Sequence, residues 1–237
     1  ACTGRDGGDR VTVACLALSR IANFDDLDPL KMHPGVRLDM VRPGQPIPEV
    51  GLRRARAATT VMLALPGSAY LYQGEELGLP EVIALPPESR QDPTWFRTDG
   101  ERYGRDGCRV PIPWSADAPG YGFSPTGAAW LPQPAEWAQL ARDVQEDDPE
   151  STLWLYRTLL ATRRAENLGA GELEWLDGYG EDVLAFRVST GAAGSVTVLA
   201  NAGSTPVPLP AGTVLVASAP FDGTDLPVDV AVWIAAD

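Results

Sequence analysis

The sequence is poor in the residues that build metal sites and disulfide frameworks. Its 237 residues include three cysteines and one histidine. The cysteines, Cys2, Cys15 and Cys108, are odd in number and widely spaced, without a Cys-x-x-Cys pair, which argues against both a disulfide framework and a zinc site. We therefore expect no metal and no other cofactor.

Basic residues and long apolar runs are also scarce. Acidic residues outnumber basic ones by 32 to 19, and the net charge of -13 would repel phosphate backbones, so we predict no nucleic-acid partner. No stretch approaches the ~18 apolar residues of a membrane span, and the first 30 residues lack a signal-peptide pattern, so we expect a cytoplasmic protein with no membrane partner. Because Ala1 is not an initiator methionine, we expect the chain to begin within a longer protein.

The remaining composition is that of a globular protein, with 44% hydrophobic residues and a mean hydropathy of -0.11. Val11–Ile21 could form one apolar element, and the prolines that follow as far as Pro48 favour loop structure. Leu52–Leu65 has high helix propensity and is stopped by Pro66. Ser68–Gln73, apolar and aromatic, is then typical of a buried parallel strand.

The second half of the chain divides into a long loop, a helix and a β region. Residues 79–148 are rich in proline and tryptophan and too long for an ordinary connection, which indicates a functional loop. Asp148 and Pro149 predict the start of an amphipathic helix that continues to about Asn167. After Gly171 we predict five short strands. They are Leu173–Leu176, Val183–Val188, Ser195–Ala200, Val214–Ala217 and Val230–Ile234.

Three segments carry a family resemblance. Pro66–Gly78 resembles the eighth strand and the following loop of the α-amylase family of glycoside hydrolases, most closely its α-glucosidase and oligo-1,6-glucosidase branch. Arg105–Trp114 is similar to the Arg-Asp-x-x-Arg-x-Pro-Met-x-Trp segment of that branch, with isoleucine in place of methionine. The tail, a helix and then a small β domain ending in Leu226–Trp233, also looks like the end of these enzymes. Together the resemblance covers residues 51–237.

The resemblance implies a fold of the α/β plus all-β kind. It would be a partial (β/α)8 TIM barrel, limited to the last barrel elements, followed by a small antiparallel β-sandwich domain. Residues 51–168 would hold the barrel elements, with the long loop at 79–148, and residues 171–237 the β domain. Residues 1–50 are then a divergent or disrupted segment. A full barrel takes about 250 residues, so this one cannot be complete.

The resemblance also implies a chemistry, retaining hydrolysis of α-linked glucose from small oligosaccharides by a nucleophilic carboxylate and an acid carboxyl. Arg109 would help to form the glucose-binding subsite, with Arg105 and Asp106 bracing the loop. A planar guanidinium suits this role because it can hold a carboxylate while facing sugar hydroxyls.

The catalytic carboxylates expected at the fourth and fifth strands are not supplied upstream of the Gly51 helix. Met32–Arg37 keeps His33 and an arginine at the spacing of the family's Asn-His-Asp-x-x-Arg segment, but Pro34 stands in place of the aspartate. An alternative alignment puts Gly35–Asp39 on the Gly-Phe-Arg-x-Asp nucleophile segment, which would require deletion of the fifth to seventh strands. We predict no catalytic residue and an inactive chain, with His33 as a candidate substrate contact.

Other readings remain beside this one. Glu75 and Glu76 are adjacent and their side chains diverge, which favours loop residues over a catalytic pair. Trp95, Trp130 and Trp137 could pack within the loop or stack on sugars. The alternatives to a hydrolase fragment are a non-catalytic carbohydrate-binding or interaction module built on the β domain, and a fragment of a trehalose synthase-type glucosyltransferase.

Overall fold

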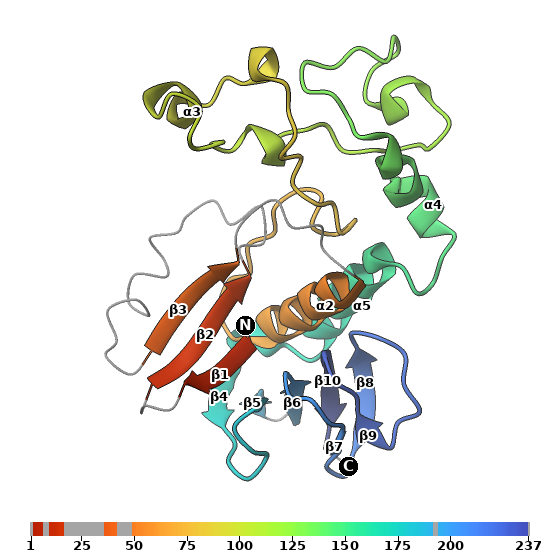
Figure 1. The fold of residues 1–237 in the computed structure, drawn as a ribbon. Coiled ribbons are helices and arrows are strands. Elements are labelled where there is room, and N and C mark those ends of the chain that lie inside the picture. The colour runs from red at the N-terminus through yellow and green to blue at the C-terminus, as the bar shows by residue number, and fades with distance from the viewer. Residues whose placement is uncertain (1, 7–9, 17–35, 42–48, 192–193, 237) are drawn as a thin grey trace.

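The computed structural model describes residues 2–6, 10–16, 36–41, 49–191 and 194–236 (Figure 1). The first three strands form one sheet in the order β1-β2-β3. They are β1 (Cys2–Asp6), β2 (Arg10–Leu16) and β3 (Val36–Val41). β2 pairs with β1 in antiparallel fashion and with β3 in parallel. The apolar element predicted from Val11 is therefore, where it is described, the strand β2.

Helix α2 (Glu49–Ala64) lies where helix propensity predicted it. Its last carbonyls are satisfied by a side chain of another helix. Arg163 Nη1 donates to the carbonyls of Leu63 and Leu65, at 2.6 and 2.7 Å, and Nη2 donates to that of Gly67 at 2.6 Å. The Leu63 carbonyl is an orphan acceptor of the helix C-terminus, and the other two belong to the turn that follows; a cation is favoured there by the helix dipole.

Helix α5 (Thr152–Ala165) begins later than predicted. The N-cap is Ser151, whose Oγ accepts a hydrogen bond from the Trp154 backbone N–H at 3.3 Å. The prediction that Asp148 is the cap was wrong. Its carboxylate instead accepts from the Glu150 N–H at 2.9 Å, a local turn that competes with helix initiation.

The C-terminal region is a five-stranded sheet in the order β4-β5-β6-β10-β8, with every neighbouring pair antiparallel. Its strands are β4 (Glu172–Trp175), β5 (Val183–Ser189), β6 (Ser195–Asn201), β8 (Thr213–Ala217) and β10 (Val230–Ala235). Each lies within one residue of its predicted bounds. A separate two-stranded sheet pairs β7 (Val207–Pro208) with β9 (Asp225–Leu226).

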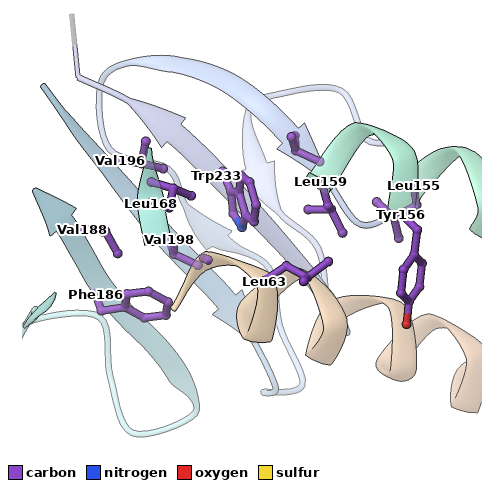
Figure 2. Packing of buried hydrophobic residues seen from close by; sticks show 12 residues of the cluster. Leu63, Leu155, Tyr156, Leu159, Leu168, Phe186, Val188, Val196, Val198 and Trp233 are labelled. Carbon is purple, nitrogen blue, oxygen red and sulfur yellow. The ribbon is translucent and has the colours of Figure 1, made fainter. Parts of the chain in front are cut away.

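The strands β5, β6 and β10 contribute buried residues to both faces of the five-stranded sheet, since successive residues of a strand point to opposite sides, whereas most of β4 is exposed. On one face α2 and α5 lie side by side over the strands (Figures 1 and 2), and Leu63, Leu159 and Trp233 are fully buried between them. Trp233 Nε1 also donates to the Thr60 carbonyl of α2 at 2.9 Å. The opposite face packs against Leu226 of the β7–β9 pair. The second layer of the expected sandwich is thus only a two-stranded sheet.

The strand predicted over Ser68–Gln73 does not form. Residues Ser68 to Leu71 are exposed, and 87% of the Tyr70 surface is accessible. A parallel strand exists only through hydrogen bonds to its neighbours. No strand in the described part of the chain pairs with this segment, so its apolar side chains are not buried by a neighbouring strand.

The loop predicted at 79–148 is present as short helical turns around a small core of its own. The turns are η2 (Pro87–Ser89), α3 (Pro93–Arg97), η3 (Asp106–Cys108), η4 (Pro119–Gly122), η5 (Ala135–Leu140) and α4 (Arg142–Glu146). Trp137 is fully buried in that core, against Val110 and Leu131, so it packs the loop. Trp130 remains largely exposed, with its Nε1 donating to the Ser89 carbonyl at 3.0 Å.

Candidate functional site

Arg109, the predicted sugar-subsite residue, is held by two buried carboxylates of the loop. Its Nη1 donates to Asp92 Oδ2 at 3.2 Å and to Asp106 Oδ1 at 3.3 Å. The two aspartate side chains are only 6% and 4% exposed, whereas that of Arg109 is 45% exposed. The two buried carboxylates therefore hold one guanidinium nitrogen, while much of the Arg109 side chain faces solvent.

Backbone N–H groups fix the two carboxylates in turn. Asp106 Oδ2 accepts from the N–H groups of Gln91 and Asp92, both at 2.9 Å. Asp92 Oδ1 accepts from the Thr94 N–H at 2.9 Å, as the N-cap of α3, and Oδ2 accepts from the Arg105 N–H at 3.1 Å. Burial opposes ionisation of Asp92, but these hydrogen bonds and the charge of Arg109 outweigh it and hold its pKa below the usual value.

The close approach of Asp92 to the Arg105 segment explains one glycine. Gly104 has a φ of +70°, and a Cβ on it would lie 2.5 Å from the Asp92 Cβ. Only glycine combines this left-handed backbone with such a contact. Arg105 itself is exposed and contributes its backbone N–H to the cluster, so the structure places Arg105, Asp106 and Arg109 together.

A second arginine, which sequence reasoning missed, organises the same loop. Arg90 is only 4% exposed, and its guanidinium donates to the carbonyls of Ile83, Leu85 and Tyr103. It also lies 4.7 Å from the Trp95 ring centroid and 5.1 Å from that of Tyr103, within the range of cation–π attraction. Trp95 is thereby a packing partner of Arg90. Asp92 was missed as well, although the Asp92-Pro93 pair is a recognisable helix start.

The acidic residues of this region have structural partners. Asp92 and Asp106 bind Arg109 and the backbone, and Glu76 accepts from the Gly74 N–H at 2.7 Å inside its own turn. Retaining hydrolysis needs two carboxyl groups about 5 to 5.5 Å apart on either side of the sugar bond. Asp92 and Asp106 are instead buried against Arg109, and Glu76 binds within its own turn, so we assign all three to the support of the loop. His33, the other predicted substrate contact, lies outside the described residues.

The described residues include neither a metal-binding cluster nor a membrane-spanning helix. Within the described ranges, no three His, Cys, Asp or Glu side chains are grouped so that they could hold a metal ion. In the same ranges, no helix has the length and apolar character needed to cross a membrane.

Residues 40–171, more than half of the chain, match the family described as the α-amylase catalytic domain. The chain belongs to the α-amylase family. A probable α-glucosidase of Rhizobium meliloti is 39% identical over 138 residues, which are 58% of this chain and 24% of that protein. The crystal structure of an α-glucosyl transfer enzyme, XgtA, matches with a TM-score of 0.62 and 32% identity, over 78% of this chain and 36% of that one. The chain thus spans about a quarter of the α-glucosidase that it matches.

A further match belongs to an unrelated protein. A cobyric acid synthase of Rhodobacter capsulatus is 59% identical over 56 residues, which are 24% of this chain and 10% of that protein. The identity is higher than in the α-glucosidase match, although the matched length is shorter. Nothing in our sequence analysis pointed to this similarity.

Proposed function

We propose that residues 49–237 are the C-terminal part of an enzyme that acts on α-glucosides, and that Arg109 belongs to its sugar-binding subsite. The observation that carries this proposal is the pair of buried carboxylates, Asp92 and Asp106, that hold one guanidinium nitrogen of an arginine whose side chain is 45% exposed. A charge that is both fixed and accessible is suited to ligand binding because little side-chain freedom is left to lose. The substrate class is small oligosaccharides with α-linked glucose, as the similarity to an α-glucosidase suggests.

The reaction proposed for the whole enzyme is retaining hydrolysis, in which a carboxylate attacks the anomeric carbon and an acid protonates the leaving oxygen. Arg109 would donate from its exposed nitrogens to sugar hydroxyls or to the nucleophilic carboxylate, and Asp92 would fix its position. The carboxylates that carry out the chemistry would come from outside residues 49–237. We therefore expect the chain by itself to be inactive.

A chimera tests this proposal. The region of the Rhizobium meliloti α-glucosidase that aligns with this chain is replaced by residues 49–237, and hydrolysis of p-nitrophenyl α-glucoside is measured. We expect activity in the chimera and none in residues 1–237. Arg109→Ala should then lower kcat/KM about 100-fold, the loss expected when a charged hydrogen bond to the transition state is removed, while exposed Arg102→Ala should not. An active chimera that is unaffected by Arg109→Ala would refute the assigned role.

Glucosyl transfer is the second candidate, favoured by the 32% identity to an α-glucosyl transfer enzyme. The same chimera distinguishes the two. Incubated with maltose and an acceptor alcohol, a hydrolase gives mainly glucose, whereas a transferase gives mainly the alkyl glucoside, so the ratio of the two products is measured.

For the residues before α2, we infer an origin in a cobyric acid synthase. The XgtA match leaves about a fifth of the chain uncovered, which is close to the 24% that the cobyric acid synthase match covers. We place the junction near the start of α2, because the α-amylase-family match begins at residue 40 and the cobyric acid synthase match is 56 residues long, and we assign the N-terminal part no activity because it is about a tenth of that enzyme. DNA upstream of the Ala1 codon should continue the cobyric acid synthase frame. An upstream frame that encodes further barrel strands would overturn this origin.

A further inference from the structure

A cavity of about 280 Å³ lies between α5 and β8, the edge strand of the C-terminal sheet (Figure 1). Its lining combines apolar side chains of both elements with one aromatic residue, Trp154, and three polar residues, Arg56, Glu150 and Thr158. None of these residues belongs to the loop that carries Arg109. Sites for small molecules usually measure about 300 to 1,000 Å³, so this volume suits a ligand of about one ring.

Arg56 supplies a fixed guanidinium at this cavity. Its Nε donates to the Ser218 carbonyl at 2.9 Å, and its Nη1 donates to the Glu150 carbonyl at 2.8 Å and to Thr152 Oγ1 at 3.4 Å. Nη2 makes no hydrogen bond within the described part of the chain, so its two N–H groups remain for a ligand. A guanidinium that is already held at two nitrogens loses little freedom when the third binds.

Trp154 supplies an aromatic ring whose position is also fixed. Its Nε1 donates to the Glu146 carbonyl at 2.8 Å, and the Arg157 guanidinium lies over the ring, 4.9 Å from its centroid. Arg157 is held in turn by an ion pair of 2.9 Å with the Glu146 carboxylate. Arg157 therefore covers one face of the ring, while the residue stays 37% exposed. Such a ring is a flat apolar surface on which the C–H groups of a ligand can pack.

The charges around Arg56 select among classes of ligand. Burial lowers the pKa of Arg56, whereas the negative charges of Asp148 and Glu150 act in the opposite direction. These two carboxylates repel an anionic ligand, and Arg56 repels a cationic one. A purely apolar ligand would remove the guanidinium from water without replacing its hydrogen bonds. The lining therefore favours a neutral ligand that has an apolar face and several hydroxyl groups.

We propose that this cavity is a binding site for one neutral pyranose ring, such as the terminal glucose of an oligosaccharide. The C–H face of the sugar packs on Trp154, and its hydroxyls accept hydrogen bonds from Arg56 Nη2 and exchange them with Thr158 and Glu150. The inference does not depend on the proposed function, because neither Arg109 nor a catalytic group takes part. Such a site would retain an oligosaccharide on the protein by one of its end units.

Saturation-transfer difference NMR of methyl α-glucoside with residues 1–237 tests the site. We expect a dissociation constant of about 1 to 10 mM, as for a ligand of one ring. Trp154→Ala should weaken binding more than about tenfold, and Trp154→Phe, which keeps a ring, less than about threefold. Trp175→Ala, at an exposed tryptophan outside the cavity, and Arg109→Ala should leave binding unchanged. Circular dichroism verifies that each variant is folded.

Arg56→Lys provides a second variant, because lysine keeps the charge but lacks the forked donors, and it should weaken binding about tenfold. No saturation transfer at tens of millimolar sugar, or binding that neither Trp154→Ala nor Arg56→Lys changes, would overturn the site. Loss of binding in Arg109→Ala would place the sugar at the loop instead. Equal affinity for glycerol, which has no ring face, or tighter binding of acetate would overturn the choice of ligand. An inactive chimera would refute the proposed function and leave this site standing.

Discussion

At the scale of single residues, the loop is built around buried charges that are each fully engaged. Arg90 donates to three carbonyls and lies between two rings, and Asp92 accepts from two backbone N–H groups and Arg109. A buried charge is tolerated only when it is paired and hydrogen-bonded in this way. These contacts fix the position of Arg109 in a loop that contains only short helical turns.

Asp92→Asn should therefore destabilise the protein in a pH-dependent way. The folded-state pKa of Asp92 is lowered, so its contribution is complete above the unfolded pKa of about 3.9 and is lost as pH falls through the folded value. We expect the variant to lose about 1 to 3 kcal/mol at pH 7, because a buried ion pair and a cap are weakened. The difference from the parent should shrink as pH falls below about 4, toward the lowered folded-state pKa of Asp92.

Urea unfolding followed by tryptophan fluorescence at several pH values measures this effect. Exposed Asp99→Asn, in the same loop, is the matched control and should show little change at any pH. A constant difference between Asp92→Asn and the parent at all pH values would contradict the assignment of the stabilisation to the ionised carboxylate.

Trp233 is a residue of the main core that also makes a hydrogen bond to α2. It is fully buried between the sheet and α2 and donates to the Thr60 carbonyl. Trp233→Phe removes this hydrogen bond and leaves a cavity, so we expect a loss of about 2 to 4 kcal/mol in the free energy of unfolding. Trp175→Phe, where 62% of the side chain is exposed, should cost less than about 1 kcal/mol. Thermal melts compare the two, and equal losses would contradict this view of the core.

At the scale of elements, the sequence predicted those helices and strands whose signals lie within their own residues. α2 and the strands β4, β5, β6, β8 and β10 lie where propensity and turn residues indicated. Ser68–Gln73 was predicted as a strand and is not one, because strand pairing depends on distant partners. The Arg105–Arg109 motif pointed to the candidate site, but the second carboxylate, Asp92, comes from 17 residues before Arg109 and could not be paired with it by spacing alone.

The junction of α2 and α5 provides an element-scale prediction. Arg163 donates to three carbonyls at the end of α2, and Arg164 beside it is exposed. Arg163→Ala leaves those acceptors unsatisfied and should cost about 2 to 3 kcal/mol, whereas Arg164→Ala should cost less than about 0.5 kcal/mol. Urea midpoints measure both. Similar midpoints for the two variants would show that water replaces the guanidinium without loss.

At the scale of the whole molecule, the stable body is the association of α2 and α5 with the C-terminal sheet. Among the side chains that the structure describes, its three hydrophobic clusters are formed by residues from Val61 onward. Ties across the body reinforce them, including an ion pair of 2.7 Å from Arg54 Nε to Asp229 Oδ1 and a hydrogen bond of 2.9 Å from Arg56 Nε to the Ser218 carbonyl. The α-amylase-family match over residues 40–171 thus overlaps the part of the chain that provides the described core.

Deletion of residues 1–48 should therefore leave this body intact. We expect residues 49–237 to keep the near-ultraviolet circular dichroism of their tryptophans and a melting temperature within about 2 °C of the parent, because no described cluster loses a member. Deletion of residues 230–237 is the contrasting control, since it removes the central strand β10 together with Trp233 and should abolish the cooperative melt. If the shorter chain melts without cooperativity, the N-terminal residues contribute to the core, and a junction between two independent pieces is wrong.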